Sequence, residues 1–210
     1  MLVKTTISMQ RMKDTYANFR ALARSEKRGK DFGVRRRRCA STTVVVAPHG
    51  GGIEPGTSEI ADAIAGANLC FYAFEGIRTT QNSKLHITST NFDEPRCLAL
   101  VRKSDQVITI HGEGSKQNFV ILGGRDKATI QRLRESLEGQ GFCVKLDNPR
   151  LPGCDLGNIC NRGTQGAGVQ MELSIGVRRT FFRSLKTRVG RQVKKQEFFD
   201  FVAAVRRVIA

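Results

Sequence analysis

The sequence predicts an α/β fold, a three-layer sandwich with a central mixed, largely parallel sheet. Three observations predict it: short apolar and β-branched runs recur along the 210 residues, segments with helical spacing of apolar residues separate them, and 40% of the chain is hydrophobic, enough for a sizeable core. Strands that alternate with helices favour a sheet with helices on both faces. We expect a single domain over 1–210, with basic flanks at 1–41 and 178–210.

The first quarter of the chain predicts a helix, a basic segment, a buried strand and a second helix. Apolar residues at helical spacing predict a helix over 11–27, and the basic segment 29–38 is a loop or an edge strand. The β-branched run 42–47, followed by a proline and three glycines, is typical of a buried strand. A second helix, capped by Thr57 or Ser58, follows it.

The middle of the chain continues the alternation of strands and helices. Apolar runs predict strands at 69–74 and 85–88, and helical spacing predicts a helix over 95–102. The Val/Ile-rich run 106–110 predicts a strand that leads directly into a histidine and a glycine. A further short strand is expected at 119–122.

The last third contains two predicted helices, two predicted strands and a long polar loop. Helical spacing predicts a helix over 127–137, and an apolar run predicts a strand at 142–146. The glycine-rich stretch 158–168 is too polar for a core element, so we interpret it as a functional loop. Alternation over 169–175 predicts a strand, and an apolar face over 196–209 predicts the last helix.

The charge of the chain is strongly basic and unevenly distributed. Lys and Arg number 35 against 19 Asp and Glu, a net charge of +16. Residues 1–41 carry 12 basic and 3 acidic side chains, residues 178–210 carry 10 and 2, and residues 42–177 carry 13 and 14. A neutral middle with cationic ends can attract a polyglutamate, a nucleic acid or an anionic surface, or can present a solvated face with no partner.

The cysteines predict free, buried thiols without a catalytic role, because they lie scattered in apolar segments of a chain with no export signal. They are Cys39, Cys70, Cys97, Cys143, Cys154 and Cys160. No stretch approaches the roughly 18 apolar residues that cross a bilayer. We therefore expect no membrane partner, and a cytoplasmic chain that leaves the cell only on lysis.

Two of the three histidines, His49 and His111, directly follow β-branched runs. Ligands of α/β sheets bind at the carboxyl ends of strands, so both imidazoles are expected in one crevice. Glu54 follows His49 across three glycines, which allow the chain to turn back towards the same point. A lone histidine is usually a hydrogen-bonded core or surface residue, but this group favours a Zn²⁺ site with one open position.

Glu172 is the candidate general base. It lies on a predicted strand, where alternation places it on one face with Gln170 and Ser174. A carboxylate on a half-buried strand needs a partner, and a zinc-bound water is one. The alternative is a salt bridge to an arginine, and Glu113 beside His111 is then the next candidate for the base.

Five motifs resemble those of the poly-γ-glutamate hydrolase family, known from phages and bacilli and also called the phage-related replication protein family. In order, they are APHGGGIEPGTSEIADAIAG, LHITSTNFDEP, VITIHG, NICNRG and GVQMELS. The resemblance covers 16–178. It implies a zinc carboxypeptidase-like fold, a bound Zn²⁺, and endo-type hydrolysis of the γ-amide bonds of a polyanionic substrate, poly-γ-glutamate.

On the matching positions, the resemblance implies that His49, Glu54 and His111 are the zinc ligands and Glu172 is the general base. The first ligand pair is spaced HxxxxE, where zinc carboxypeptidases have HxxE, and the Asn-Arg pair follows the last histidine instead of preceding it.

Three further residues are candidates for substrate binding. Arg162, next to Asn161, can pair bidentately with a substrate carboxylate, although a surface arginine is an equal alternative. His86 has weaker flanking sequence than the other histidines, so we expect it to contact substrate or to orient a ligand.

Two alternative functions are each consistent with part of the sequence. A nucleic-acid-binding, replication-associated protein would explain the basic ends, but no recognisable nucleic-acid motif is present and the candidate ligands lie in the neutral middle. A zinc amidase for another acylated amino acid or a cell-wall peptide would use the same chemistry on a different substrate. We expect the poly-γ-glutamate hydrolase.

Overall fold

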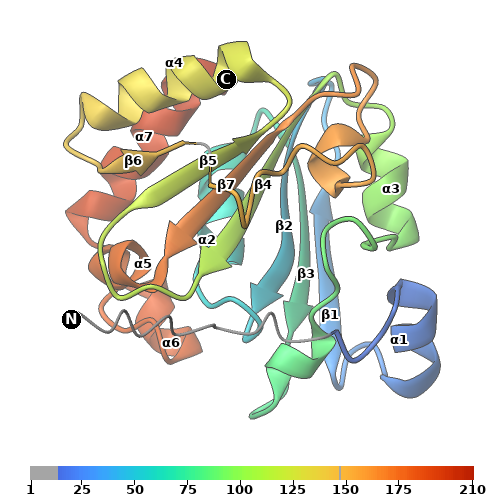
Figure 1. Cartoon of the computed structure of the whole chain (residues 1–210). Helices are drawn as coiled ribbons and strands as arrows, with labels where there is room; N and C mark the ends of the chain where they lie inside the picture. The colour runs from blue at the N-terminus through green and yellow to red at the C-terminus, as the bar shows by residue number, and fades with distance from the viewer. Residues whose placement is uncertain (1–13, 147) are drawn as a thin grey trace, which may run out of the picture.

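The computed structural model describes residues 14–146 and 148–210, and Figure 1 shows a seven-stranded sheet with helices on both sides. The strands are β1 (Phe32–Arg37), β2 (Thr43–Gly51), β3 (Cys70–Gly76), β4 (Gln106–Glu113), β5 (Val120–Gly124), β6 (Val144–Lys145) and β7 (Val169–Ser174). Their order in the sheet is β1-β3-β2-β4-β7-β5-β6. β3, β2, β4 and β7 run parallel, whereas β1 and β5 are antiparallel to their neighbours β3 and β7. The mixed, largely parallel sheet is confirmed.

The helices form the two outer layers. They are α1 (Phe19–Ser25), α2 (Thr57–Ala65), α3 (Pro95–Val101), α4 (Lys127–Glu138), α5 (Ile175–Phe181), α6 (Arg188–Gln192) and α7 (Gln196–Ile209), with the 3-10 helices η1 (Asn82–Leu85) and η2 (Ile159–Asn161). Apolar residues of α2, α4, α5 and α7 pack on one face of the sheet, and those of α1, α3, η1 and η2 pack on the other. No helix within 14–146 or 148–210 has the length and apolar content needed to cross a bilayer.

Alternation along the central strands supplies both cores. Val45 and Ala47 of β2 belong to the core under α2, α4, α5 and α7, while Val44 and Val46 belong to the core under α1 and α3. Both sets are buried, as expected of a parallel strand covered on both faces. We refer to the face that Val44 and Val46 share as the front face.

Several predicted elements differ from those observed. Residues 85–88, predicted as a strand, contain the end of η1 and an irregular segment. Leu85 and Ile87 are buried against the front face, so their alternation reflects a loop packed on the core. The strand expected at 142–146 shrinks to the two residues of β6, and α5, α6 and η2 were not predicted.

Two helix starts also differ. Helix α1 begins at Phe19, where Asn18 accepts a hydrogen bond from the amide of Ala21, and positions 11–13 of the predicted helix lie outside the described residues. Helix α2 starts at Thr57 after Gly56, which has a left-handed φ of 96°, and no side chain caps it. The segment 29–38 contains the edge strand β1, so the edge-strand alternative was right.

Candidate metal centre

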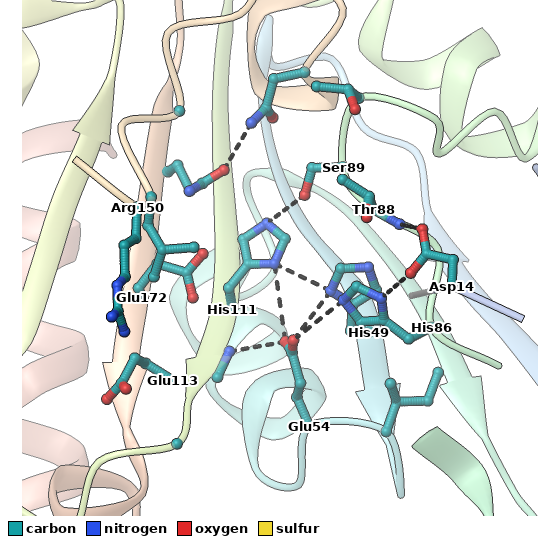
Figure 2. A pocket seen from close by; sticks show the side chains of 18 of the residues that line it. Asp14, His49, Glu54, His86, Thr88, Ser89, His111, Glu113, Arg150 and Glu172 are labelled. Carbon is teal, nitrogen blue, oxygen red and sulfur yellow. Dashed lines mark hydrogen bonds and ion pairs between the residues drawn. The ribbon is translucent and has the colours of Figure 1, made fainter. Parts of the chain in front are cut away.

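The candidate site lies on the front face, towards the carboxyl ends of β2, β4 and β7. His111 of β4 and Glu172 of β7 are partners in the register of the two parallel strands, so their side chains lie next to each other on this face. A pocket of about 860 Å³ opens over them, and Figure 2 shows its side chains. Loops that contain residues 83–90 and 149–155 form its walls.

Three donor atoms converge at the base of the pocket. His49 Nδ1 lies 3.2 Å from Glu54 Oε1 and 3.2 Å from His111 Nδ1, and His111 Nδ1 lies 3.8 Å from Glu54 Oε2. Figure 2 shows the two rings and the carboxylate directed at one another. The structure therefore brings together the three residues that the sequence proposed as ligands.

A bulge in β2 turns His49 into the pocket. Ala47 packs behind the sheet, so a regular strand would place His49, two residues later, on the same rear face. The register shifts between Ala47 and Gly50, and the ring instead lies on the front face, 6.2 Å from the ring of Phe92. His49 and His111 thus lie inside their strands, near the ends, and not after them.

The glycines between His49 and Glu54 are required by close packing. A Cβ on Gly50 would overlap Ser58 Oγ, and one on Gly51, where φ is +64°, would overlap the carbonyl oxygen of Gly76. The turn closes when the amide of Glu54 donates to the carbonyl of His49 at 2.8 Å.

Each donor residue is oriented through its other polar atom. His49 Nε2 donates to the carbonyl of Ile87 at 2.7 Å, and His111 Nε2 lies 3.5 Å from Ser89 Oγ. Glu54 Oε2 accepts a hydrogen bond from the amide of Gly112 at 2.8 Å. Such contacts fix the tautomer and direction of a metal ligand, and here they leave both Nδ1 atoms facing the common point.

The protonation states suit a cation. Burial raises the pKa of Glu54, but His49 and the other two histidines outweigh it and lower that pKa to about 2. Burial lowers the pKa of His111 to about 3, although Glu54 opposes it. Burial also lowers the pKa of His49, and Glu54 more than offsets this, so the pKa is raised. An ionised carboxylate at Glu54 and a neutral imidazole at His111 are what a metal ion requires of its ligands.

Glu172 lies beside this cluster, and no side chain or backbone group of the described residues is bonded to its carboxylate. Its side chain is buried, only 7% exposed, and within the described chain it makes no hydrogen bond or ion pair. Burial, followed by the charges of Glu54 and Glu113, raises its pKa well above the usual range, and Arg178 opposes them. The nearby Glu113 differs, because its Oε2 accepts a hydrogen bond from the amide of Ser115 at 2.7 Å.

Arg178 lies beneath the site and was not predicted. Its buried guanidinium donates to the carbonyls of Leu173 at 3.0 Å, Pro55 at 2.7 Å and Glu113 at 3.0 Å. It therefore ties β7 to the turn after Glu54 and to the end of β4. No motif in the sequence indicates this arginine, because its three partners are backbone atoms.

His86 lines the pocket as expected, and Asp14 orients it. His86 Nδ1 lies 2.7 Å from Asp14 Oδ1, and the His86 ring stacks on the ring of His49 with centroids 4.0 Å apart. Asp14 also accepts a hydrogen bond from the amide of Thr88. His86 Nε2 is 3.9 Å from Glu54 Oε1 and faces the cluster. Asp14 was not predicted, since it lies far from its partner in the sequence, 72 positions earlier.

Asn161 and Arg162 do not lie where the sequence placed them. The guanidinium of Arg162 donates to the carbonyls of Gly157, Thr90 and Phe92, and neither residue lines the pocket. Asn161 is buried, and its amide group bonds to the backbone of Gly153, Asp155 and Gly168. Direct substrate contact is therefore corrected to a structural function: both side chains hold the polar loop that forms one wall of the pocket.

Two other cationic side chains do line the pocket. Lys84 comes from η1 and Arg150 from the loop before η2, and both are exposed. Figure 2 shows Arg150 beside Glu172 and Glu113. Neither belongs to a recognisable motif, so no pattern in the sequence could have identified them.

The fold and this site define the class of the protein as an α/β sandwich with a candidate metal centre at the carboxyl edge of its sheet. A family model described as "Poly-gamma-glutamate hydrolase" matches residues 16–204. The chain therefore belongs to the poly-γ-glutamate hydrolase family and is a hydrolase. Among relatives from Bacillus subtilis (strain 168), the UPF0714 protein YndL is 37% identical over 99% of this chain and 82% of its own length. The SPbeta prophage-derived UPF0714 protein YoqZ is 37% identical over 93% of this chain and 72% of its own length.

Solved structures support the same assignment. A bacteriophage poly-gamma-glutamate hydrolase superposes with a TM-score of 0.90 at 30% identity, over 93% of this chain and 96% of the phage protein. A zinc-free apo form of YndL superposes with a TM-score of 0.89 at 35% identity, over 94% of this chain and 98% of YndL. An N-formylglutamate amidohydrolase from Ralstonia eutropha JMP134, at 12% identity and a TM-score of 0.52 over 85% and 96% of the two chains, shares the fold alone.

Proposed function

We propose that this chain cleaves the γ-glutamyl amide bonds of poly-γ-glutamate, with one zinc ion held by His49, Glu54 and His111. The observation that carries the proposal is the convergence of their three donor atoms beside the buried, unpartnered carboxylate of Glu172. Two imidazoles and one carboxylate are a catalytic zinc donor set with one position left open. The likeness to a phage poly-γ-glutamate hydrolase and to a protein with a zinc-free apo form supports both substrate and metal.

Glu172 acts as the general base and acid of the reaction. Zinc, when bound, supplies a Lewis acid that polarises the amide carbonyl and makes water more acidic. Glu172 takes a proton from the attacking water and returns it to the nitrogen of the leaving amine. Its position next to His111 on the front face, without a competing protein partner in the described chain, leaves its carboxylate free for both transfers.

Lys84 and Arg150 receive carboxylates of the substrate. Each glutamate of the polymer is linked through its side-chain carboxyl and keeps one free carboxylate, so a bound segment carries several negative charges. The two cations reach the pocket from separate segments of the chain, and His86, oriented by Asp14, adds a hydrogen-bonding group beside His49. Binding of a single-stranded nucleic acid would need a basic groove with exposed aromatic rings, whereas acidic and histidine side chains outnumber Lys84 and Arg150 in the lining of this pocket, and no Phe or Tyr is among its described lining residues.

The test combines metal content with polymer length. Protein purified without added metal should contain about one zinc per chain and should shorten poly-γ-glutamate, as followed by size-exclusion chromatography. His49→Ala combined with His111→Ala should lose both properties. A metal-free wild type that still cleaves the polymer contradicts the zinc assignment. A zinc-loaded protein that leaves the polymer intact but hydrolyses another acylated amino acid or a cell-wall peptide would establish the alternative substrate.

The enzyme resides in the cytosol until the cell lyses. This part of the proposal is supported by the free state of all six cysteines, because a reducing compartment keeps thiols unpaired. Immunodetection in the cytosolic fraction of intact cells, and in the medium only after lysis, is the expected result.

A further inference from the structure

A pair of thiols lies away from the pocket, where β1 leaves the sheet and β3 begins. Cys39 follows β1 by two residues, and Cys70 is the first residue of β3. Their Sγ atoms are 3.3 Å apart, and the backbone amide of Cys39 donates to Cys70 Sγ at 3.3 Å. All six cysteines are free thiols; Cys70, Cys97 and Cys160 are buried, Cys39 and Cys154 are half-buried, and Cys143 is exposed. Of the six thiols that the sequence predicts to be buried, the structure buries three.

The sheet holds the two thiols in this arrangement. β1 and β3 are antiparallel, and their last paired residues are Arg37, shortly before Cys39, and Phe71, directly after Cys70. Cys39 Sγ also donates to the carbonyl of Asn68, and Cys70 Sγ donates to the carbonyls of Cys39 and Ser41, so each sulfur atom contacts the backbone of the other's segment. A disulfide has an S–S length of about 2.04 Å, so these atoms need to approach by only about 1.3 Å.

We propose that Cys39 and Cys70 are an oxidative cross-linking site that forms an intramolecular disulfide when the chain meets a small disulfide such as glutathione disulfide. The Cys39 thiolate attacks one sulfur of the reagent, forms a mixed disulfide and releases one glutathione thiolate. The Cys70 thiol then loses its proton to solvent and attacks Cys39 Sγ, which releases the second glutathione. Two cysteine thiols are oxidised by two electrons, and one glutathione disulfide is reduced to two thiols.

The order of the two steps follows from exposure. Cys39 is half-buried and accessible to the reagent, whereas Cys70 is 4% exposed within the front core. Burial, followed by the contact with the Cys39 thiol, raises the pKa of Cys70, although the backbone amide of Cys39 opposes it, and Cys70 is therefore the slower nucleophile towards a reagent in solution. Once the mixed disulfide has formed on Cys39, the short distance between the two sulfur atoms compensates for the low reactivity of the Cys70 thiol.

The cross-link ties an edge strand to the interior of the sheet. It closes a loop that contains β2 and α2, so it restricts the unfolded chain and should raise Tm by roughly 5–15 °C. The thiols lie at the end of the sheet where β2 and β3 begin, and the metal centre lies towards the opposite, carboxyl end, so hydrolysis should be unchanged.

The experiment uses the zinc-loaded full chain with Cys143→Ser, which removes the exposed thiol that can join two copies. After incubation with glutathione disulfide, alkylation and mass spectrometry should show two thiols fewer and a peptide cross-linked between Cys39 and Cys70. Tm should rise and should return to its starting value with dithiothreitol. Cys39→Ser and Cys70→Ser in the same background should show no such rise with oxidant.

Three results would overturn the proposal. One is a glutathione adduct on Cys39 that persists without resolution by Cys70. Another is a cross-link that joins a different pair of cysteines. The third is a cross-linked protein whose Tm equals or falls below that of the reduced chain, because the sheet would then have been strained by the bond.

Discussion

Each of the three proposed metal ligands has two polar side-chain atoms, and one of the two contacts another part of the protein. The partners are the carbonyl of Ile87, the hydroxyl of Ser89 and the amide of Gly112. Two of these three are backbone atoms, so substitution of their side chains does not remove them. The site is therefore directed mainly by the path of the chain, and mutations that move that path should affect metal affinity more than conservative changes on the pocket wall.

Among single side chains, Glu172→Gln is the test of the general base. The change keeps the shape of the side chain and removes its ability to accept a proton, so kcat should fall by roughly 10²- to 10⁴-fold with zinc content and fold unchanged. Glu113→Gln is the matched control, since Glu113 already accepts a backbone hydrogen bond. Loss of zinc in the first variant would make Glu172 a ligand, and a wild-type rate would move the base to Glu113.

Arg150→Gln tests carboxylate binding. Removal of one exposed cation that hydrogen-bonds a substrate carboxylate should raise KM by roughly 10-fold and change kcat little. Arg150→Lys should recover part of the loss because it keeps the charge without the planar fork. Lys103→Gln, an exposed lysine that does not line the pocket, should leave KM unchanged. If the Arg150→Gln enzyme has the wild-type KM, Arg150 does not bind a substrate carboxylate and Lys84 is the remaining candidate.

At the scale of strands and loops, the three donor residues are easier to predict from the sequence than the conformation of the segments around them. Histidines near the ends of strands and a glycine-linked glutamate form a local pattern that identifies the three residues whose donor atoms converge. The bulge that turns His49 to the front face has no such pattern, because it depends on the packing of Gly50 and Gly51 against β3 and α2. The prediction for Arg162 was wrong because the sequence around an arginine does not show whether its guanidinium binds backbone carbonyls of a loop, as here, or a substrate carboxylate.

The end of β4 offers a test of how the strands direct the ligands. A Cβ on Gly112 would lie 2.7 Å from Arg178 Cζ, and Arg178 cannot retreat because three carbonyls hold it. Gly112→Ala should therefore displace the backbone amide of residue 112, which donates a hydrogen bond to Glu54. We expect this to weaken zinc binding roughly 10- to 100-fold and to lower Tm. Gly114→Ala, where a Cβ meets nothing within 4 Å, is the matched control. Chelator competition measures the affinity, and equal values for the two variants would contradict the argument.

At the scale of the whole molecule, the excess positive charge lies at the two ends of the sequence. The structure divides these basic side chains into those bonded within the protein and those exposed to solvent. Arg35 and Arg37 pair with Asp62, and Arg206 donates to the carbonyl of Ile64 and to Asn68, so these side chains are structural. Exposed cations remain on the segment after α5, whose Phe182 packs against Gly56 close to the metal centre. Together with Lys84 and Arg150 of the pocket wall, these are the cations that we expect to attract a polyanion towards the pocket.

The corresponding prediction concerns salt dependence. Neutralising three cations near the pocket should raise KM at low salt and flatten its dependence on ionic strength, with kcat unchanged. The substitutions are Arg183→Gln, Lys186→Gln and Arg188→Gln. The control removes the same charge from exposed residues where β4 begins and α7 ends, by Arg102→Gln, Lys103→Gln and Arg207→Gln. Equal effects of the two triple variants would show that net charge matters and its position does not.

The two borders of the sheet also bear on how the protein behaves in crowded solution. An unpaired strand edge is a template for a second chain, and long, flat, apolar edges lead to aggregation. Among the described strands, one border is β1, where the exposed Arg36 lies between the paired Arg35 and Arg37, and the other is the two-residue β6. The Arg36 side chains of approaching copies of β1 repel each other, and β6 is too short to pair with a neighbouring chain. We therefore expect Arg36 to oppose edge-to-edge association of the enzyme at high concentration, whatever it contributes to substrate attraction.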